Sequence, residues 1–540
     1  MTSMMGMSFV ASAADAVPSQ VALINDAIEQ GWRDYEIRPA PEVDDATWCR
    51  RVYLDVIGRI PTLEELKTFL DSKGSDKRAK LVDQLLYDDK YTEEYANHWG
   101  SIWTNVLIGR SGGTDRRSMT SRDGMQKYLR DAFATNKPYN TMVYELVTAE
   151  GSTKPGTDKF NGAVNFLVDK VNDENGVLAT SSTSRIFLGQ QVQCTQCHNH
   201  PFNQWKQQKF WEFNSFFRQT RSLRRFVNGT RDIDHAELVS EDFAGEAGDP
   251  NDALVFYELR NGLTKVAYPV FTDGTEIEKS GYVSEVNRRQ ELGRLMLESE
   301  FLDKMAVNRI WSHFLGFGFT KPIDDLGPHN PASHPALLED LAKEFRKSSY
   351  DTKQLITWIT LSRPYNLKAL LGPANEIDDP TIGEMPKFSR FYLRQMSAEQ
   401  LYQSLVSSTN AGGGGSYEEQ ERQRRQWMQQ FVVAFGTDEG DEATTFNGSI
   451  PQALMLFNGD LVKNATSTKP GSFLDQLSQS GRSPRDRLTD LFMAGLARRP
   501  SKDELTIAGK LMVARKGNEK EMLQDMWWAI LNTNEFIMQH

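Results

Sequence analysis

The sequence predicts a mainly α-helical, multi-domain protein in which a small β insert separates two helical halves. Apolar residues recur at helix spacing over most of the chain. A stretch rich in Gly, Asp and Asn, with short β-type runs, interrupts this pattern. The length of 540 residues also exceeds what one hydrophobic core usually supports. We therefore expect helical halves at 20–220 and 286–540, with the β insert at 221–285.

Three kinds of signal predict helices in the first half: periodic apolar residues, a proline that ends a helix and a residue that can cap a helix N-terminus. The periodic residues are Leu81, Val82, Leu85 and Leu86, and then Met125, Tyr128, Leu129, Ala132 and Phe133. Lys137-Pro138 follows the second set and ends its helix, because proline cannot continue one. The run Pro61-Thr62-Leu63-Glu64-Glu65 starts another helix, with Thr62 as a plausible N-cap.

The β insert contains one strong hairpin signal. Two β-type runs, at 253–257 and 264–268, flank Asn261-Gly262. Asn-Gly favours the tight turn of an antiparallel hairpin. Helical spacing resumes near Arg288, with apolar stripes at 337–345 and 355–359.

A faint internal repeat links the two ends of the chain. The run 53–66 resembles the run 492–505, and each reads as a helix, a tight turn and a second helix. Two copies do not make a solenoid. We interpret the repeat as a common helix-turn-helix packing unit.

Composition excludes some functions. The formal net charge is -11 and the isoelectric point is about 5.4, whereas proteins that bind nucleic acid or anionic lipid are usually basic. We expect no nucleic-acid partner and no transmembrane segment, since no run approaches the ~18 apolar residues of a span. Of the three cysteines, Cys49 stands alone and is expected to be buried rather than reactive.

The N-terminal residues suggest export. A short apolar run ends in Ala11-Ser12-Ala13, a small-x-small pattern typical of a cleavage site. No Lys or Arg precedes Arg33, so the basic start of a signal peptide is missing. We expect residues 1–13 to be the remnant of a signal peptide that begins upstream, with a disordered, Ala-rich terminus as the alternative. A periplasmic or cell-surface protein is then expected.

The segment most informative about chemistry is Cys194-Thr-Gln-Cys197-His198. Each of the two vinyl groups of haem can form a thioether with one cysteine sulfur, and one helical turn matches their spacing. The histidine that follows then ligates the iron. The pattern predicts one covalently bound c-type haem with Cys194, Cys197 and His198 as its attachment and proximal residues.

Other chemistries fit the same segment. Cys194, Cys197, His198 and His200 could bind zinc, although structural zinc sites usually combine two separated ligand pairs. A dithiol redox pair and a chance motif are further alternatives. The sixth ligand of a haem is open. His200 is too close in sequence to reach the opposite face, and the candidates are His98, His313, Met296 and Met305.

A second polar cluster lies at 324–335. Asp324, Asp325, His329 and His334 together could bind a divalent metal. The alternative is a rigid loop in which Ser333 caps the next helix and Pro335 occupies its first turn.

Several motifs resemble a two-part family of exported proteins that is abundant in planctomycetes. The first part, a cytochrome-like domain, matches at 51–62, 95–99, 136–139 and 187–202, which includes the Cys-x-x-Cys-His segment. The second part, its usual C-terminal companion, matches at 288–292, 307–313, 322–325, 329–335, 396–401 and 450–454. Both are domains of unknown function. The resemblance implies export, a cytochrome-like segment and a helical C-terminal half, but it supplies no substrate.

Three functions follow as hypotheses. The first is an exported c-type cytochrome that transfers electrons, or serves as the redox part of an oxidoreductase, with an unidentified redox partner protein. The second is a metal-dependent enzyme acting on polysaccharides or their substituents through the 324–334 cluster. The third is a non-catalytic binding or scaffold protein. Whether the chain is an enzyme is left open.

Overall fold

The computed structural model describes residues 18–115, 117–172, 175–201, 203, 205–245, 249–409, 419, 422, 424, 426–427 and 460–540. The expected signal-peptide remnant, residues 1–13, lies outside them, as does the family-like run 450–454. Helices dominate the described chain and its sheets are small, which confirms the mainly α prediction. Within the described chain no helix is long and apolar enough to cross a membrane.

The first half folds into helices that follow the predicted apolar stripes. They are α1 (Ser19–Asp34), α2 (Asp45–Ile57), α3 (Leu63–Asp71), α4 (Lys77–Tyr87), α5 (Asp89–Ile108), α6 (Arg122–Ala134), α7 (Tyr139–Thr148), α8 (Val177–Leu188) and α9 (Gln207–Asn214). The stripes at 81–86 and 125–133 fall on α4 and α6. The Thr62 hydroxyl accepts a hydrogen bond from Glu65 N at 3.2 Å, and the Glu65 carboxylate accepts one from Thr62 N at 2.8 Å, so the cap is a full capping box.

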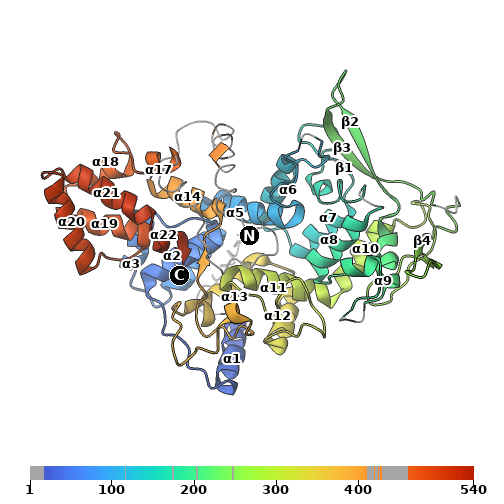
Figure 1. Cartoon of the computed structure of the whole chain (residues 1–540), viewed down its shortest axis with the longest axis horizontal. Helices are drawn as coiled ribbons and strands as arrows, with labels where there is room; N and C mark the ends of the chain where they lie inside the picture. The colour runs from blue at the N-terminus through green and yellow to red at the C-terminus, as the bar shows by residue number, and fades with distance from the viewer. Residues whose placement is uncertain are drawn as a thin grey trace, which may run out of the picture.

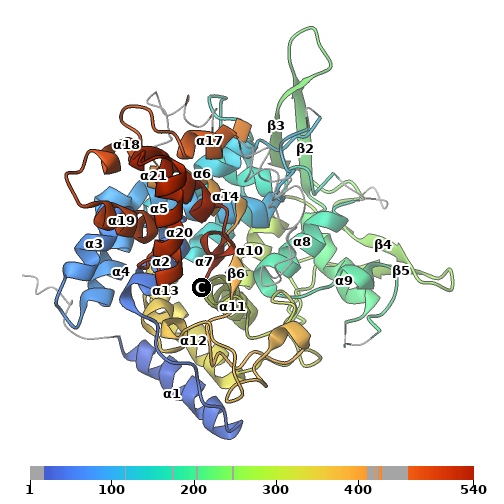
Figure 2. The same cartoon turned by 60° about the vertical axis from the view of Figure 1, so that its left-hand side comes forward.

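Short strands occupy the predicted insert. β2 (Thr220–Phe226) and β3 (Ile233–Ser240) form an antiparallel hairpin that projects from the body (Figures 1 and 2), and β1 (Gly151–Ser152) pairs with the other edge of β3. β4 (Val255–Glu258) pairs antiparallel with β5 (Thr264–Ala267). Gly262 in their turn has a φ of 80°, a conformation that glycine adopts without strain. The Asn-Gly hairpin prediction is confirmed.

The second half is again helical. Its elements are α10 (Arg288–Glu298), α11 (Glu300–Leu315), α12 (Pro335–Lys347), α13 (Thr352–Leu361), β6 (Arg394–Gln395), α14 (Ala398–Thr409), α17 (Asp460–Ala465), α18 (Phe473–Ser478), α19 (Pro484–Leu496), α20 (Lys502–Ala514), α21 (Glu519–Leu531), α22 (Asn534–Ile537) and β7 (Met538–Gln539). The two apolar stripes predicted here fall on α12 and α13. β6 and β7 pair antiparallel and so anchor the end of the chain.

The main hydrophobic core crosses the boundary between the predicted halves. It joins buried side chains of α1 to α8 with those of α10 to α13, and α10 packs on α7 while α11 packs on α8. Trp99 of α5 stacks on Phe314 of α11, with ring centroids 6.0 Å apart. A second core contains residues of α14 and of the helices from α17 through α22, together with Leu54 and Ile60. Separate domains therefore stay a prediction, because neither core belongs to one half alone.

The faint sequence repeat corresponds to two similar helical units. α2 to α5 form the first unit, and α19 to α22 form the second, at the other end of the chain. In both units a residue with positive φ follows the first helix: Gly58 at 80° and Ala497 at 52°. In both a capping box, at Thr62 or Ser501, starts the second helix.

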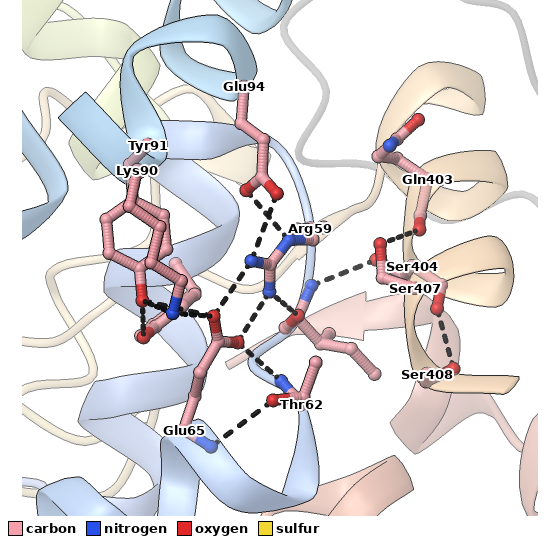
Figure 3. A network of polar contacts seen from close by, with 12 residues as sticks. Arg59, Thr62, Glu65, Lys90, Tyr91, Glu94, Gln403, Ser404, Ser407 and Ser408 are labelled. Carbon is pink, nitrogen blue, oxygen red and sulfur yellow. Dashed lines mark hydrogen bonds and ion pairs between the residues drawn. The ribbon is translucent and has the colours of Figure 1, made fainter. Parts of the chain in front are cut away.

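A buried arginine closes the first unit (Figure 3). The Arg59 guanidinium pairs with Glu65 at 2.7 Å and with Glu94 at 2.9 Å. It also donates to the carbonyl of Ile60 at 3.1 Å and lies 5.5 Å from the ring centroid of Tyr53. The side chain is only 5% exposed.

The second unit repeats these contacts at equivalent positions. The Arg498 guanidinium pairs with Glu504 at 2.8 Å and with Glu535 at 2.5 Å. It donates to the carbonyl of Arg499 at 3.2 Å and lies 5.5 Å from the ring centroid of Phe492. The likeness thus extends to side chains, further than a generic helix-turn-helix unit requires.

The two units pack against each other. α3 of the first contacts α19 of the second, and Lys67 pairs with Asp490 at 2.7 Å. Arg50 of α2 donates to the carbonyl of Phe536 at 2.7 Å. Figure 1 shows the C-terminal helices beside α2 and α3. The two units, which are far apart in the sequence, are therefore joined in the folded protein.

The two arginines should differ in their effect on stability. Arg59→Leu leaves the buried Glu65 carboxylate with Lys90, 3.5 Å away, as its only cation among the described residues, and breaking a buried pair costs about 3–5 kcal/mol. Arg498 is 35% exposed, so water screens its ion pairs and Arg498→Leu should cost about 1 kcal/mol. Urea unfolding of both variants measures the difference. An equal loss of unfolding free energy in the two variants would contradict burial as the cause of the expected difference.

Candidate functional site

The cysteine segment follows α8 through a tight turn. Gly189 ends the helix with a φ of 61°, and its N–H donates to the Arg185 carbonyl at 3.1 Å. A single 3₁₀ turn, Gln193–Gln196, then carries Cys194, and Cys197 follows directly. Both thiols are exposed and free. The two sulfurs are therefore accessible, one short helical turn apart in sequence.

Helix α9 holds the segment from the other side. Gln207 Nε2 donates to the carbonyl of Gln196 at 3.1 Å, and Trp211 Nε1 donates to the same carbonyl at 3.1 Å. Thr195 is buried between the two cysteines, and its hydroxyl donates to the Val192 carbonyl at 2.5 Å. The backbone of the turn is thus fixed while both cysteine side chains face outward.

The two histidines of the segment are partly exposed. His198 Nδ1 lies 2.6 Å from the carbonyl of Asn199. His200 N donates to the Trp205 carbonyl at 2.8 Å, and His200 Nδ1 accepts a hydrogen bond from Asn203 N at 3.1 Å. The side chain of Phe202, part of the family-like His-Pro-Phe run, lies outside the described residues.

The second polar cluster lies against this segment. Leu326 N donates to the Gly189 carbonyl at 2.6 Å, and Gln191 Nε2 donates to Asp324 Oδ1 at 3.1 Å. Arg185 NH1 lies 3.5 Å from Asp324 Oδ2. Two regions that the sequence presented as separate candidate sites are therefore packed against each other.

A histidine pair forms where the two regions meet. The ring centroids of His200 and His329 are 6.2 Å apart, and His329 Nε2 lies 2.9 Å from Asp325 Oδ1. Partial burial lowers the pKa of His200, and the neighbouring His329 lowers it further, whereas Asp325 opposes the change. The fold thus brings His200 of the cysteine segment to His329 and Asp325 of the second cluster.

His334 does not join them. Its ring lies 5.6 Å from that of Phe388 and 6.3 Å from that of Phe319, on the other side of the loop. The four-residue metal set expected from sequence is therefore not assembled. The expected cap also differs: His334, not Ser333, is the N-cap residue of α12, and Ser333 N instead donates to the Phe319 carbonyl at 2.7 Å. Pro335 occupies the first turn as expected.

Two regions of the chain match known protein families. Residues 23–222 match the family described as PSCyt2, protein of unknown function (DUF1549), and residues 288–512 match PSD1, protein of unknown function (DUF1553). The chain therefore contains a PSCyt2 region followed by a PSD1 region. This order confirms the two-part resemblance seen in the motifs. No curated protein and no solved structure matches the chain.

The site uses both family regions. The cysteine segment lies in the PSCyt2 part, and the Asp324 to His329 loop lies in the PSD1 part. Sequence reasoning missed Arg185, Gly189 and Gln191, which connect the two. The Gly189 position carried a signal, since a glycine directly after a helix often marks a left-handed turn.

The donor set fits covalent haem better than a zinc ion. Two free, exposed thiols and the following histidine are the groups that c-type attachment uses. Zinc needs about four ligands converging on one point. Among the described residues, no group of three or more His, Cys, Asp or Glu side chains is arranged to hold a metal ion. Zinc binding at the PSCyt2 segment would therefore require side chains to move.

Three of the four sixth-ligand candidates from sequence are buried and His313 is partly buried, and only the sulfur of Met305 lies beside Gly189, the residue that leads into the cysteine segment. His98 and His313 face each other inside the protein, with ring centroids 5.7 Å apart, and both contact Trp99. Met296 and Met305 are fully buried in the core. Cys49 is also fully buried, and burial raises the pKa of its thiol, as expected for an unreactive cysteine.

Gly189 is expected to be sensitive to substitution. A Cβ there would lie 2.7 Å from Leu326 Cγ and 3.0 Å from Met305 Sδ. Gly156 also has positive φ, 86°, but nothing lies within 4 Å of its Cβ position. Gly189→Ala should therefore lose about 1–3 kcal/mol more stability than Gly156→Ala. Thermal or urea unfolding checks this, and equal losses would contradict the close packing of the two regions.

Proposed function

We propose that the chain is an exported c-type cytochrome-like protein that carries one covalently bound haem and acts in electron transfer, alone or as the redox part of an oxidoreductase. One observation carries the proposal: Cys194 and Cys197 are free and exposed on a backbone turn that α9 holds in place, and His198 follows them directly. Export is part of the proposal, because c-type haem attachment takes place outside the cytoplasm.

Each residue has a defined role in holding the group. The Cys194 and Cys197 S–H groups would add across the two haem vinyl groups, so that each sulfur bonds to carbon and its hydrogen goes to the neighbouring carbon. This addition needs no external oxidant or reductant. His198 would supply the proximal nitrogen, and the bound haem would supply one-electron redox chemistry.

The surface around the segment suits exchange with a partner protein. Cys194 and Cys197 are exposed, and the partly exposed side chains of Arg185 and Asp325 bring both signs of charge to the neighbouring surface. Charged groups around a contact surface steer the encounter of two proteins and fix its orientation. An unidentified redox partner is therefore part of the proposal.

The two other hypotheses have less support. A metal-dependent polysaccharide enzyme would need Asp324, Asp325, His329 and His334 together, but His334 packs against Phe319 and Phe388. The scaffold hypothesis leaves the exposed thiols without a role. We therefore favour the cytochrome function.

Redox cycling tests the electron-transfer role. The chain, with a complete signal peptide, is produced in a host that matures c-type cytochromes, purified, reduced with dithionite and reoxidised with ferricyanide. We expect fully reversible absorption changes over repeated cycles and a single one-electron midpoint in a potentiometric titration. A bound haem that is bleached or cannot be cycled would contradict a role in electron transfer.

A further inference from the structure

The hairpin of β2 and β3 extends beyond its contacts with the body. At its base, Ser222 Oγ donates to the Val168 carbonyl at 2.5 Å, and Ala236 packs with Met119 and Val168. From there the hairpin points away from the helices, as Figures 1 and 2 show. All residues from 224 to 232 are exposed. About three residues of extended strand separate the base from the turn, which is a distance of about 10 Å.

Two large apolar side chains lie in the solvent at the tip of this hairpin. Phe226 is 53% exposed and Val227 is 43% exposed. The backbone of the turn is fixed, because Val227 N donates to the Asp232 carbonyl at 3.0 Å and Thr230 N donates to the Val227 carbonyl at 3.0 Å. The hairpin therefore holds an apolar pair in water, away from the hydrophobic cores of the chain.

The charge of the hairpin is opposite to that of the whole chain. The formal net charge of the chain is -11, but the run 221–231 has no acidic residue and contains four arginines: Arg221, Arg224, Arg225 and Arg231. Arg225 pairs with Glu237 at 2.7 Å. The other three arginines have no carboxylate partner among the described residues, and Asp232 is the one acidic residue that follows the run directly.

The negative charge of the body has little effect at the tip. At physiological ionic strength the Debye length is about 8 Å, which is shorter than the distance of about 10 Å between the base of the hairpin and its turn. A negatively charged surface that meets the tip is therefore attracted by the arginines more strongly than it is repelled by the acidic body.

Protection of the sheet edge explains only part of this pattern. β2 lies at one edge of the sheet, whose order is β1-β3-β2, and charged side chains on an edge strand hinder pairing with another chain. This accounts for the arginines. It does not account for Phe226 and Val227, whose apolar surface is unfavourable in water. Arginines beside an apolar tip fit the surface of a bilayer, where lipid phosphates lie next to the acyl chains.

We propose that the β2–β3 hairpin docks the protein on an anionic phospholipid bilayer. Phe226 and Val227 would insert between the lipid headgroups, and Arg221, Arg224 and Arg231 would lie near the phosphates. This docking requires no bound haem, so it stands or falls independently of the cytochrome function.

Co-sedimentation of the full chain with vesicles tests the docking. The probes are vesicles of phosphatidylglycerol mixed with phosphatidylcholine, and vesicles of phosphatidylcholine alone. We expect binding to the first and at least about tenfold weaker binding to the second, because each arginine near an anionic surface strengthens binding about fivefold. Raising the salt concentration to about 1 M shortens the Debye length to about 3 Å and should weaken binding to the anionic vesicles.

Variants of the hairpin separate the apolar and the charged contributions. Phe226→Ser/Val227→Ser should weaken binding to the anionic vesicles about tenfold or more, because the inserted apolar surface is lost. Arg224→Gln/Arg231→Gln should weaken it by a similar factor. Both variants should melt at the temperature of the wild type, because the four side chains are exposed.

The matched control is a second exposed pair of the same residue types. Phe256 of β4 lies opposite Val266 of β5, and these side chains are 36% and 41% exposed. Their hairpin lacks the arginine-rich run and has the exposed Glu258 on β4. Phe256→Ser/Val266→Ser should therefore bind anionic vesicles as the wild type does.

Three results would overturn the docking. The first is a wild-type chain that binds neither kind of vesicle, and the second is equal binding by the wild type and the Phe226→Ser/Val227→Ser variant. The third is binding to the soluble polyanion dextran sulfate, retained by that variant, without binding to vesicles. The hairpin would then recognise an acidic macromolecule instead of a membrane.

Discussion

Lowering the pH from 7 to 5 is expected to reduce the free energy of unfolding by about 4 kcal/mol through His98 and His313 alone. Burial, together with the neighbouring His313, lowers the pKa of His98 to about 3. Burial also lowers the pKa of His313 to about 3, with Arg394 adding to the effect. Both imidazoles therefore stay neutral in the folded protein at pH 5.

The sign follows from proton binding. The unfolded chain binds protons at these histidines below pH 6.5, whereas the folded protein does not until about pH 3. Stability is therefore fully present above pH 6.5 and is lost as the pH falls toward 3. His334 and His540, whose pKa values burial lowers to about 4, act in the same direction.

Urea unfolding at a series of pH values measures this dependence. The variant His98→Gln removes one titrating group, so the slope of stability against pH between 7 and 5 should become shallower, whatever its absolute stability. Arg59 and Arg498 lower the pKa values of Glu65 and Glu504 to about 2. The stabilisation that these two glutamates give is lost only as the pH falls below 4.5, so they do not affect the comparison between pH 7 and 5. An unfolding midpoint that does not change between pH 7 and 5 would contradict neutral buried histidines.

Asp55→Ala is expected to destabilise the protein by about 3–5 kcal/mol. Asp55 is fully buried on α2, accepts a hydrogen bond from Tyr365 OH at 2.7 Å and forms an ion pair with Arg394. Arg394 also donates to Gln539 at 2.8 Å, so the carboxylate connects α2 to the strand pair at the end of the chain. Without the Asp55 carboxylate, the buried guanidinium of Arg394 loses its only carboxylate partner among the described residues.

The control is an aspartate on the surface. Asp83→Ala on α4 removes an exposed carboxylate and should change stability by no more than about 0.5 kcal/mol. Asp55→Asn keeps the size of the side chain and tests the charge alone. Chemical unfolding of the three variants gives the comparison, and a loss at Asp55 as small as that at Asp83 would contradict a buried charge network.

Local structure could be predicted because its causes are local. The stripes on α4, α6, α12 and α13 fix which helix faces are buried. Asn261-Gly262 fixes a turn through backbone conformation, and Thr62 with Glu65 fixes a helix start. Each of these depends on residues a few positions apart, so a single sequence carries the information.

Long-range arrangement could not be predicted in the same way. The pairing of β1 with β3 joins residues more than eighty positions apart, and the repeat gave no sign that its two copies would pack through Lys67 and Asp490. The core shared by both halves arises from such contacts. Nothing in the periodicity of one helix specifies its partner.

In the candidate site, too, the local features could be predicted and the long-range contacts could not. The motif at 194–198 was visible because all its chemistry lies in five consecutive residues. Its contact with the loop at 324–329 depends on Gln191 and Asp324, which are 133 positions apart. The separation of His334 from His329 was equally hidden, because the four residues between them can turn a side chain toward either side of a loop.

A pyridine haemochrome spectrum, with an in-gel haem stain, tests the central claim most directly. The chain is produced with a complete signal peptide in a host that matures c-type cytochromes, beside Cys194→Ser/Cys197→Ser and the control Cys49→Ala. We predict one covalently bound haem per chain in wild type and control, and none in the double variant. A wild-type protein that is folded and exported but colourless would contradict the claim.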